Sequence, residues 1–402
     1  MSGASRFEWM KHHAVSPHGE RLDCGVGCPP SADELEIIGR ALRVFRSADI
    51  ERYYGRDSQW RVFYESKQRA TVQTLLEGSV EEAAQILRNL DCNYLCYGFE
   101  DLHADVPEAY AIPGQREAYA IHCKDLLVRL GEALGVLRVE NPEGGEWGNN
   151  MQLPQDEVVR RIRQCTKIPL PIPDLNRGLH GLRSGSGLLT ERGLNSYYCA
   201  YRALQVVGGQ NGSRILEIGG GMGYVAYFAV LSGCQEFTVV DLPLSNLLQS
   251  YFLMRALGGD RVVLTGEPDP SQGNFVRITS PAFLAKKPPI DLVVNVDGFT
   301  EYGIETAGNY LDMIRQISPR MLSVNHEANS YSFRDVVEKT GGFANAQRHP
   351  YWMRNGYVEE LIDFHQPMEL GKTVGSGNAM ERAFSMVEKV REKVKRWRRR
   401  PI

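Results

Sequence analysis

The segment 215–223 has the clearest capacity for chemistry. It reads Ile-Leu-Glu-Ile-Gly-Gly-Gly-Met-Gly, so an apolar run leads into a cluster of glycines. Glycine has no Cβ, and a turn built from it lets a ligand approach the backbone closely. A second apolar run, 237–240, ends at Asp241. This order is typical of a βαβ unit that binds a nucleoside-bearing cofactor, with the final acid facing the ribose hydroxyls. The glycines of the turn are Gly219, Gly220, Gly221 and Gly223.

The residues around this turn separate two classes of cofactor. A dinucleotide site usually reads G-x-G-x-x-G, but the position three after Gly221 is the bulky Tyr224. Glu217 stands two residues before the first glycine, where its charge would repel a pyrophosphate and suit a cationic amino group. The pattern E-x-G-x-G-x-G with a downstream acid resembles motif I and the acidic loop of class I S-adenosylmethionine-dependent methyltransferases. Dinucleotide binding and a glycine turn without a ligand are the alternatives.

This resemblance implies a fold, a cofactor and a role for each residue of the site. The fold is α/β and Rossmann-like, with a seven-stranded, mostly parallel sheet, and the cofactor is S-adenosylmethionine. Glu217 is expected to face the amino group of the cofactor, Asp241 the ribose hydroxyls and Leu242 the adenine. The residues expected to cover the cofactor are Tyr198, Tyr201 and Arg183, with a packed helix face and a surface arginine as the alternative.

Polar residues also follow two later apolar runs. Asp297 and Glu301 follow the run 291–296, and His326 and Glu327 follow the run 320–325. In open α/β sheets, ligands bind outside the carboxyl ends of the strands. We therefore expect these four side chains at the same edge of the sheet as the glycine turn, although each alone also suits a structural role.

The same segments carry a narrower resemblance. The stretch 291–302, then Tyr310-Leu311 and Ser323-Val324-Asn325-His326-Glu327, resembles the sugar O-methyltransferase family. That family reads close to N-x-D-S-F-x-E-M, followed by a strand ending N-H-E, and the resemblance covers roughly residues 180–365. Gly298 stands where serine is common and Tyr302 where methionine is common. The resemblance implies a sugar or glycosylated small molecule as the acceptor.

Methyl transfer to a hydroxyl requires in-line alignment and removal of a proton. His326 is the preferred base, because histidine titrates near pH ~6.5, with Glu327 or Asp297 orienting it or binding sugar hydroxyls. Alternatively, Asp297, Glu301 and Glu327 hold Mg²⁺ against a diol, since hard oxygen ligands suit that ion. His180, on a glycine-rich loop, is a second candidate base.

The bulk properties suit a globular protein without a nucleic-acid partner. The 402 residues are 43% apolar and 24% charged, with a net charge of −3, which gives no case for binding nucleic acid. The longest apolar run, 222–231, is far shorter than the ~20 residues of a membrane helix. The first eight residues resemble neither a signal nor a transit peptide, so a cytoplasmic location is expected. The oligomeric state stays open, and a homo-oligomer is one alternative.

Eight cysteines are scattered along the chain, and two pairs are four residues apart: Cys24 with Cys28 and Cys92 with Cys96. A structural zinc site would need further ligands at matched spacing. We expect reduced thiols instead.

The chain divides into five predicted parts. These are a flexible arm over 1–30, a mostly helical domain over 31–140, a linker over 141–178, the Rossmann-like domain over 179–375, and a basic helix or tail over 376–402. Ser31-Ala32-Asp33-Glu34 predicts a capping box and a helix start. The predicted parallel strands are 214–218, 236–240, 261–264, 291–296 and 320–325, followed by two closing strands at 345–352 and 356–364. The basic tail suits a solvated helix end, or contact with acidic lipid or a glycan-assembly partner.

Three rival functions remain at this point: an O-methyltransferase for a non-sugar natural product, an NAD-dependent oxidoreductase, and a non-catalytic scaffold with a cofactor-type fold. An apolar, aromatic-lined pocket would favour the first rival, because phenolic acceptors bury apolar surface.

Overall fold

The computed structural model describes residues 19–21, 29–55, 58–100, 112, 114–141, 143, 148–173, 175–176, 179–209, 212–270, 273–342 and 345–364. Most of the predicted arm, with Cys24 and Cys28, lies outside these residues, as does the whole basic tail over 376–402.

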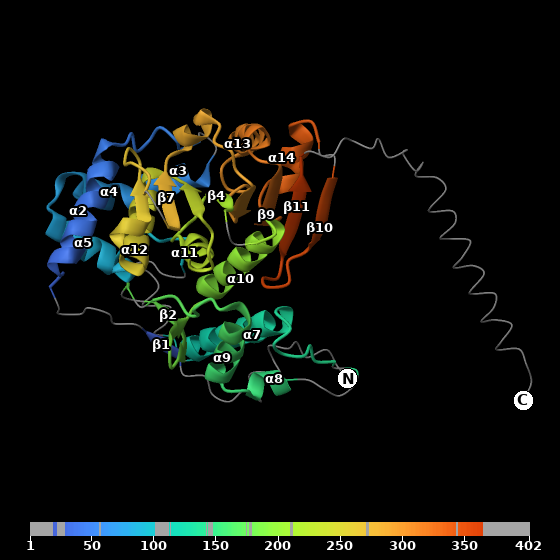
Figure 1. Cartoon of the computed structure of the whole chain (residues 1–402). Helices are drawn as coiled ribbons and strands as arrows, with labels where there is room; N and C mark the ends of the chain where they lie inside the picture. Colours follow the sequence, from blue (N-terminus) through green and yellow to red (C-terminus); the bar gives the residue numbers. More distant parts are fainter. Residues whose placement is uncertain are drawn as a thin grey trace, which may run out of the picture.

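An eight-stranded sheet forms the centre of the molecule, in the order β10-β11-β9-β8-β4-β5-β7-β6 (Figure 1). Strands β6 to β9 run parallel to β4 and β5, whereas β11 is antiparallel to β9 and β10 is antiparallel to β11. This is the predicted Rossmann-like α/β arrangement. The strands are β4 (Arg214–Ile218), β5 (Glu236–Val240), β6 (Val262–Leu264), β7 (Phe275–Thr279), β8 (Leu292–Val296), β9 (Arg320–His326), β10 (Asn345–Pro350) and β11 (Tyr357–Asp363).

The prediction of seven strands is wrong by one, because β7 was missed. β7 lies between β5 and β6 in the sheet. The described residues between β6 and β7 contain no helix, so the alternation of strand and helix used for the prediction gave no signal there. The other seven strands are confirmed to within two residues at each end.

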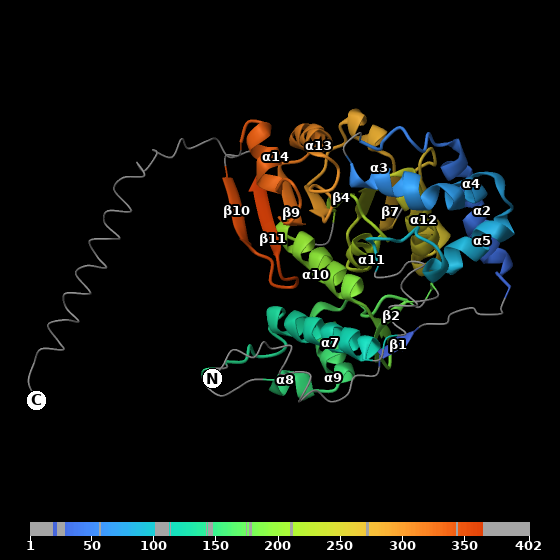
Figure 2. The ribbon, with the colours of Figure 1, turned by 180° about the vertical axis from the view of Figure 1, so that it is seen from behind.

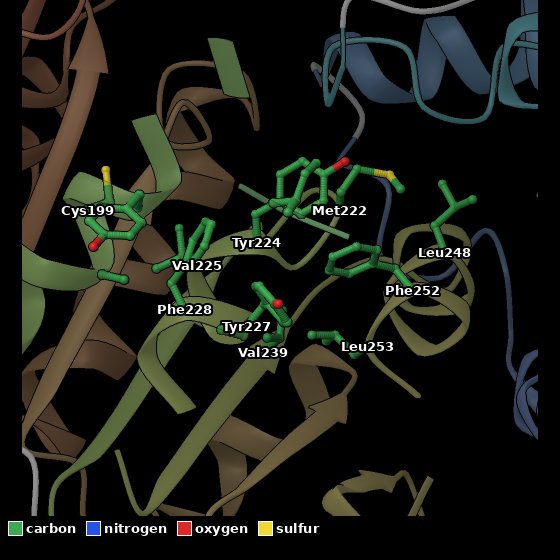
Figure 3. Close-up of a cluster of buried hydrophobic side chains, with 14 of the residues drawn as sticks. Cys199, Met222, Tyr224, Val225, Tyr227, Phe228, Val239, Leu248, Phe252 and Leu253 are labelled. Atoms are coloured by element: carbon green, nitrogen blue, oxygen red, sulfur yellow. The ribbon is translucent and has the colours of Figure 1, made fainter. Parts of the chain in front are cut away.

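Helices cover both faces of the sheet, as an all-apolar set of parallel strands requires. α10 (Glu191–Val206), α11 (Tyr224–Leu231) and α12 (Pro243–Leu257) pack on one face, and α13 (Ile304–Ile317) and α14 (Phe333–Lys339) pack on the other. α11 is apolar on every side, and all but its last residue are buried. Figure 3 shows Val225 and Phe228 of this helix among Val239 of the sheet and Phe252 of α12.

The N-terminal helices form two groups that lie beside different helices of the Rossmann-like core. α2 (Ala32–Ser47), α4 (Arg69–Glu77) and α5 (Val80–Arg88) lie beside α12, whereas α7 (Gln115–Ala133) lies beside α10 (Figures 1 and 2). The Ser31 side chain accepts a hydrogen bond from the Glu34 backbone, which confirms the predicted helix start. One continuous hydrophobic cluster joins both groups to the sheet.

The predicted linker over 141–178 contains regular structure. α8 (Asn149–Gln152) and α9 (Gln155–Thr166) lie within it, and α9 packs against α7. α9 buries Val158, Val159 and Ile162 on one face. The prolines and glycines that suggested a linker flank this helix rather than interrupt it.

A small antiparallel sheet joins three short strands, β1 (Gly19–Arg21), β2 (His180–Ser184) and β3 (Gly187–Leu189). No helix within the described residues has both the length and the apolarity needed to span a bilayer.

Candidate active site

The carboxyl ends of the central strands open into a cavity. In the sheet order, β4 is flanked by β5 and β8. The connections from β4 therefore lead to opposite halves of the sheet, which makes β4 the topological switch point. Open α/β sheets bind ligands at this point. The cavity occupies about 940 Å³ including its open mouth. Its walls come from the glycine turn, the ends of β5 and β8, α10, and N-terminal segments that carry Trp60 and Phe99.

The glycine turn forms one wall of the cavity and packs so closely against its neighbours that side chains do not fit at Gly219 and Gly220. Gly219 has a φ of 79°, and a Cβ at this position would lie 2.1 Å from the Tyr302 hydroxyl. A Cβ at Gly220 would lie 2.6 Å from Cγ1 of Val239. Gly221 also lines the cavity, whereas Gly223 is the residue before α11 and does not. Both the backbone conformation and the tight packing therefore require glycine here.

Two acids on this wall lack a cationic partner among the described residues. Glu217 is 1% exposed, and its Oε2 has no hydrogen-bond partner in the described structure. Burial, and next the charge of Asp241, raise the pKa of Glu217 to about 8. Burial also raises the pKa of Asp241 to about 6, against hydrogen bonds from Leu242 N (2.7 Å) and Gln249 Nε2 (2.8 Å). Such a pair favours a ligand that brings positive charge.

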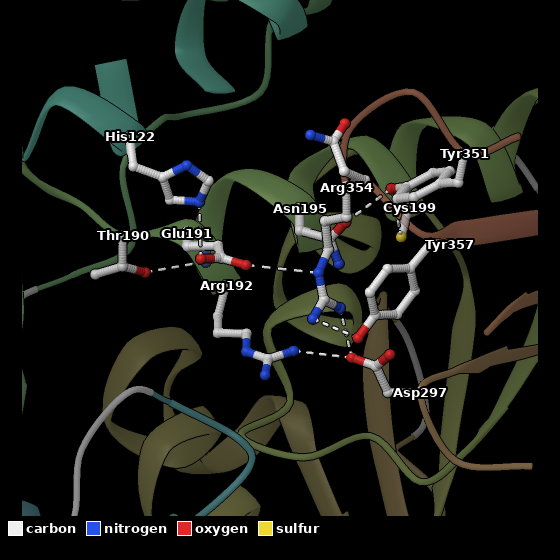
Figure 4. A network of polar contacts seen from close by, with 12 residues as sticks. His122, Thr190, Glu191, Arg192, Asn195, Cys199, Asp297, Tyr351, Arg354 and Tyr357 are labelled. Carbon is white, nitrogen blue, oxygen red and sulfur yellow. Dashed lines mark hydrogen bonds and ion pairs between the residues drawn. The ribbon is translucent and has the colours of Figure 1, made fainter. Parts of the chain in front are cut away.

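Asp297 lies at the same edge of the sheet, but its carboxylate is paired with two arginines. Its Oδ2 accepts hydrogen bonds from Arg192 Nη1 at 2.8 Å and Arg354 Nη1 at 2.5 Å (Figure 4). Burial opposes its ionisation, but the charges of Arg354 and Arg192 outweigh burial and hold the pKa of Asp297 below its usual value. Asp297 has a φ of 65°, a left-handed conformation that Asp adopts more readily than most residues.

This ion pair extends into a network across several elements. Arg354 also lies 3.5 Å from Glu191 Oε1, and Glu191 Oε2 contacts His122 Nε2 of α7 at 2.9 Å (Figure 4). The guanidinium of Arg354 lies 3.8 Å from the centre of the Tyr357 ring. The network thus links α7, α10, the end of β8 and the β10–β11 connection.

Glu301 lines the cavity and is held by the N-terminal region. Trp60 Nε1 donates to Glu301 Oε2 at 3.0 Å, and the Gln59 N–H and Ser58 hydroxyl both donate to the Glu301 carbonyl oxygen. Burial, and then the charge of Asp297, raise the pKa of Glu301 to about 7. Glu301 is therefore near half-ionised at neutral pH.

The two other predicted catalytic residues lie away from the cavity wall. His326 lies opposite Tyr357 in the β9–β11 pair, and its Nδ1 accepts from the Ala328 backbone at 3.3 Å. Glu327 is exposed and pairs with Arg348 at 2.8 Å. Neither residue lines the cavity.

The structure does not support the Mg²⁺ alternative. Among the described residues, no group of three His, Cys, Asp or Glu side chains is placed to hold a metal ion. The carboxylate of Asp297 is instead taken by two arginines and that of Glu327 by a third. Cys92 is exposed and Cys96 is buried.

The residues predicted to cover the cofactor do not line the cavity. Tyr198 packs edge-on against Trp352, with ring centres 4.7 Å apart. Arg183 and His180 belong to β2 of the small sheet. Leu242, by contrast, lines the cavity as predicted.

Several residues of the cavity wall were missed. From α10 these are Arg192, Asn195 and Ser196, whose spacing places three polar side chains on one helix face. The Tyr351 hydroxyl donates to Asn195 Oδ1 at 2.8 Å and orients it (Figure 4). Trp60 and Phe99 also line the wall, and no local pattern could place them there because they are far away in the sequence.

Gly298 and Tyr302 pack directly against each other. A Cβ at Gly298 would lie 2.1 Å from the Tyr302 hydroxyl and 2.6 Å from Nδ2 of Asn295. The tyrosine thus fills the space that a side chain at 298 would take, and its hydroxyl donates to the Ile218 carbonyl at 3.3 Å. The tyrosine at 302 can occupy this position only because residue 298 has no side chain.

No family model and no curated protein matches this chain. Among solved structures, it is similar to magnesium protoporphyrin IX methyltransferase (ChlM) from Synechocystis PCC 6803 with bound SAM, at 12% identity and a TM-score of 0.31, over 42% of this chain and 81% of ChlM. It is also similar to PH1948 from Pyrococcus horikoshii, a proposed RNA methyltransferase, at 15% identity and a TM-score of 0.30, over 43% and 85% of the two chains. A third is TrmK from M. capricolum in complex with S-adenosylhomocysteine, at 14% identity and a TM-score of 0.28, over 41% and 69%.

Proposed function

We propose that this protein is an S-adenosylmethionine-dependent O-methyltransferase that acts on a hydroxyl of a sugar or glycosylated small molecule. The observation that carries the proposal is the pair of acids at the glycine turn. Glu217 is buried beside Asp241 without a cationic partner among the described residues. A pyrophosphate in this position would oppose the ionisation of both acids, whereas a cationic amino group would favour their ionised forms and pair with them.

The residues of the wall suit each part of this cofactor. Glu217 would answer the amino group, and Asp241 the ribose hydroxyls. Leu242 lines both the cavity and a smaller neighbouring hollow, and would offer apolar surface to an adenine in the cavity. When bound, S-adenosylmethionine supplies an electrophilic methyl group on a sulfonium.

Glu301 is the group best placed to take the proton from the acceptor hydroxyl. It lines the cavity, and Trp60 fixes the position of its carboxylate. A pKa of about 7 makes it available as a base at neutral pH, and a positioned general base contributes about 10²–10⁴-fold to rate. Asp297 is unsuited to this role, because two arginines hold its charge.

The acceptor class rests on the polar groups of the same wall. Arg192, Asn195 and Ser196 of α10 and Glu301 offer donors and acceptors to several hydroxyls of one ring. Trp60 and Phe99 also give the cavity an aromatic side, and this observation favours the second candidate, an O-methyltransferase for a non-sugar natural product.

Calorimetry on the full chain tests the cofactor. We expect heat with S-adenosylmethionine and S-adenosylhomocysteine and none with NAD. Tight binding of NAD alone would overturn the proposal.

Comparison of two variants tests the base, once an acceptor is found by transfer of a labelled methyl group. Glu301→Gln should lower kcat by about 100-fold and remove the fall in rate below about pH 7 that protonation of Glu301 causes. His326→Ala should retain most of the activity. The reverse result would return the role to His326.

A further inference from the structure

A group of aromatic side chains leads from the cavity wall to the surface of the molecule. We call it the aromatic strip, and it consists of Trp60, Phe63, Tyr94, Tyr97 and Phe99. Trp60 and Phe99 lie inside, 5.2 Å apart between ring centres, and both line the cavity. Phe63 and Tyr97 continue outward as a stacked pair with ring centres 4.2 Å apart and an interplanar angle of 22°. Trp60 and Phe63 connect the two pairs edge to face at 6.4 Å.

The strip is built from two segments that meet at the mouth of the cavity. One is α3 (Gln59–Phe63), which the hydrogen bonds to Glu301 fix against the Rossmann-like core and which lies beside the central strands in Figure 2. The other is the turn over 97–99, where Tyr97 is exposed and the next residue, Gly98, already lines the cavity. A Cβ at Gly98 would lie 3.0 Å from the Trp60 ring, and its φ is 78°. Glycine at 98 thus lets the turn reach the cavity within three residues.

Each segment of the strip carries one exposed apolar side chain. Tyr97 is 42% exposed and Val62 is 66% exposed, and both belong to the few large hydrophobic side chains that the described structure leaves in solvent. Exposed aromatic surface that continues a ligand cavity marks an interaction site, because covering it recovers hydrophobic free energy.

We propose that the aromatic strip binds a second ring of the acceptor, the pyranose ring next to the one that is methylated. An aromatic face carries negative partial charge and attracts the weakly positive C–H groups on the face of a sugar ring. Charged groups border the strip: Lys67 Nζ lies 4.8 Å from the centre of the Tyr94 ring, and Arg61 pairs with Glu65 at the surface. They can bond sugar hydroxyls, whereas a planar apolar ring would leave them without a ligand partner.

This inference rests on the proposed function, since it assigns the strip to the same acceptor. It adds that the natural acceptor has at least two rings, and that recognition of the outer ring comes from the N-terminal region rather than from the Rossmann-like core.

The experiment uses the full chain on an array of defined oligosaccharides of one to six rings. We expect binding to ligands of two or more rings, weakened about 10-fold by Tyr97→Ala and retained in Tyr97→Phe, which keeps the ring. Val62→Ala is the matched control, because Val62 is an exposed apolar residue of α3 that is not part of the aromatic strip; it should bind as the wild type does. Phe63→Ala should weaken binding to the same ligands, and its melting temperature separates this loss from unfolding.

Three results would overturn the strip as a sugar site. These are no oligosaccharide binding by the wild type, binding that ignores Tyr97→Ala, and binding of the planar probe 4-methylumbelliferone with the same loss in Tyr97→Ala. Heat with S-adenosylmethionine, measured on the same preparation, separately reports the proposed function. Cofactor heat without oligosaccharide binding rejects the strip alone, and absence of cofactor heat rejects the proposed function.

Discussion

The carboxylates at the ends of β4 and β5 differ from the one at the end of β8, although all three lie at one edge of one sheet. Glu217 and Asp241 have raised pKa values, about 8 and about 6, because burial is not balanced by a cation among the described residues. Asp297 has a lowered pKa, because Arg354 and Arg192 outweigh the same burial.

The presence or absence of a cationic partner distinguishes acids suited to bind a ligand from acids that stabilise the fold. A buried acid without a cation is costly in the free protein and gains most from a cationic ligand. An acid between two guanidinium groups has already made its interactions and fixes the elements around it. Position at the edge of a sheet does not reveal which role an acid has.

The largest expected effect is on stability, from Asp297. Asp297→Ala would leave Arg192 and Arg354 without their shared partner. Because the Asp297 side chain is 20% exposed, the expected cost is about 2–3 kcal/mol, below the ~3–5 kcal/mol of a fully buried ion pair. Urea denaturation measures this loss. Asp297→Asn should cost less, because Asn tolerates the left-handed backbone and still accepts a hydrogen bond. If both variants matched the wild type, the structural role assigned to Asp297 would be wrong.

The next effect is on cofactor affinity, from Glu217. Glu217→Gln removes the charge that answers the amino group and should weaken S-adenosylmethionine binding about 10–100-fold, or about 1.4–2.8 kcal/mol. Calorimetry measures it. Glu236→Gln is the matched control, because Glu236 lies at the opposite end of the neighbouring strand and pairs with Arg277. Equal affinity in all three proteins would remove the contrast between the two kinds of acid.

Substitutions at Gly298 and Tyr302 test the packing between the end of β8 and the end of β4, where the Tyr302 hydroxyl donates to the Ile218 carbonyl. Gly298→Ser alone should destabilise the protein by about 1–3 kcal/mol, because its Cβ would meet the Tyr302 hydroxyl. Adding Tyr302→Met should restore part of the loss, with a coupling of about 0.5–3 kcal/mol in a double-mutant cycle. Additive costs would show that the two positions are independent.

The smallest effect is the pH dependence of stability without ligand. The folded pKa of Glu217, about 8, lies above its ordinary value of 4.5. The folded state therefore holds a proton that the unfolded state releases, and stability falls as pH rises through this window. Glu217→Gln should match the wild type near pH 5 and have a higher Tm than the wild type near pH 9. Identical melting curves at both pH values would contradict a buried, uncompensated Glu217.

Much of the framework follows from local patterns in the sequence. The apolar runs that end at Glu217, Asp241 and Asp297 form neighbouring parallel strands, so their polar ends had to meet at one edge. β7 was not predicted because the described residues between β6 and β7 contain no helix. Tyr198 was expected to cover the cofactor, yet it packs against Trp352. The face of α10 that lines the cavity carries Arg192 and Asn195 instead.

Local sequence is enough to predict the glycine turn and the acids beside it, because chain neighbours and strand periodicity position them without help from distant residues. Which acid has a counter-ion depends instead on long-range contacts, since Arg354 is 57 residues from Asp297. Folding also brings Trp60 to Glu301, 241 residues away. The charge state of a buried group depends on everything within a few ångströms of it, and that neighbourhood is assembled by folding.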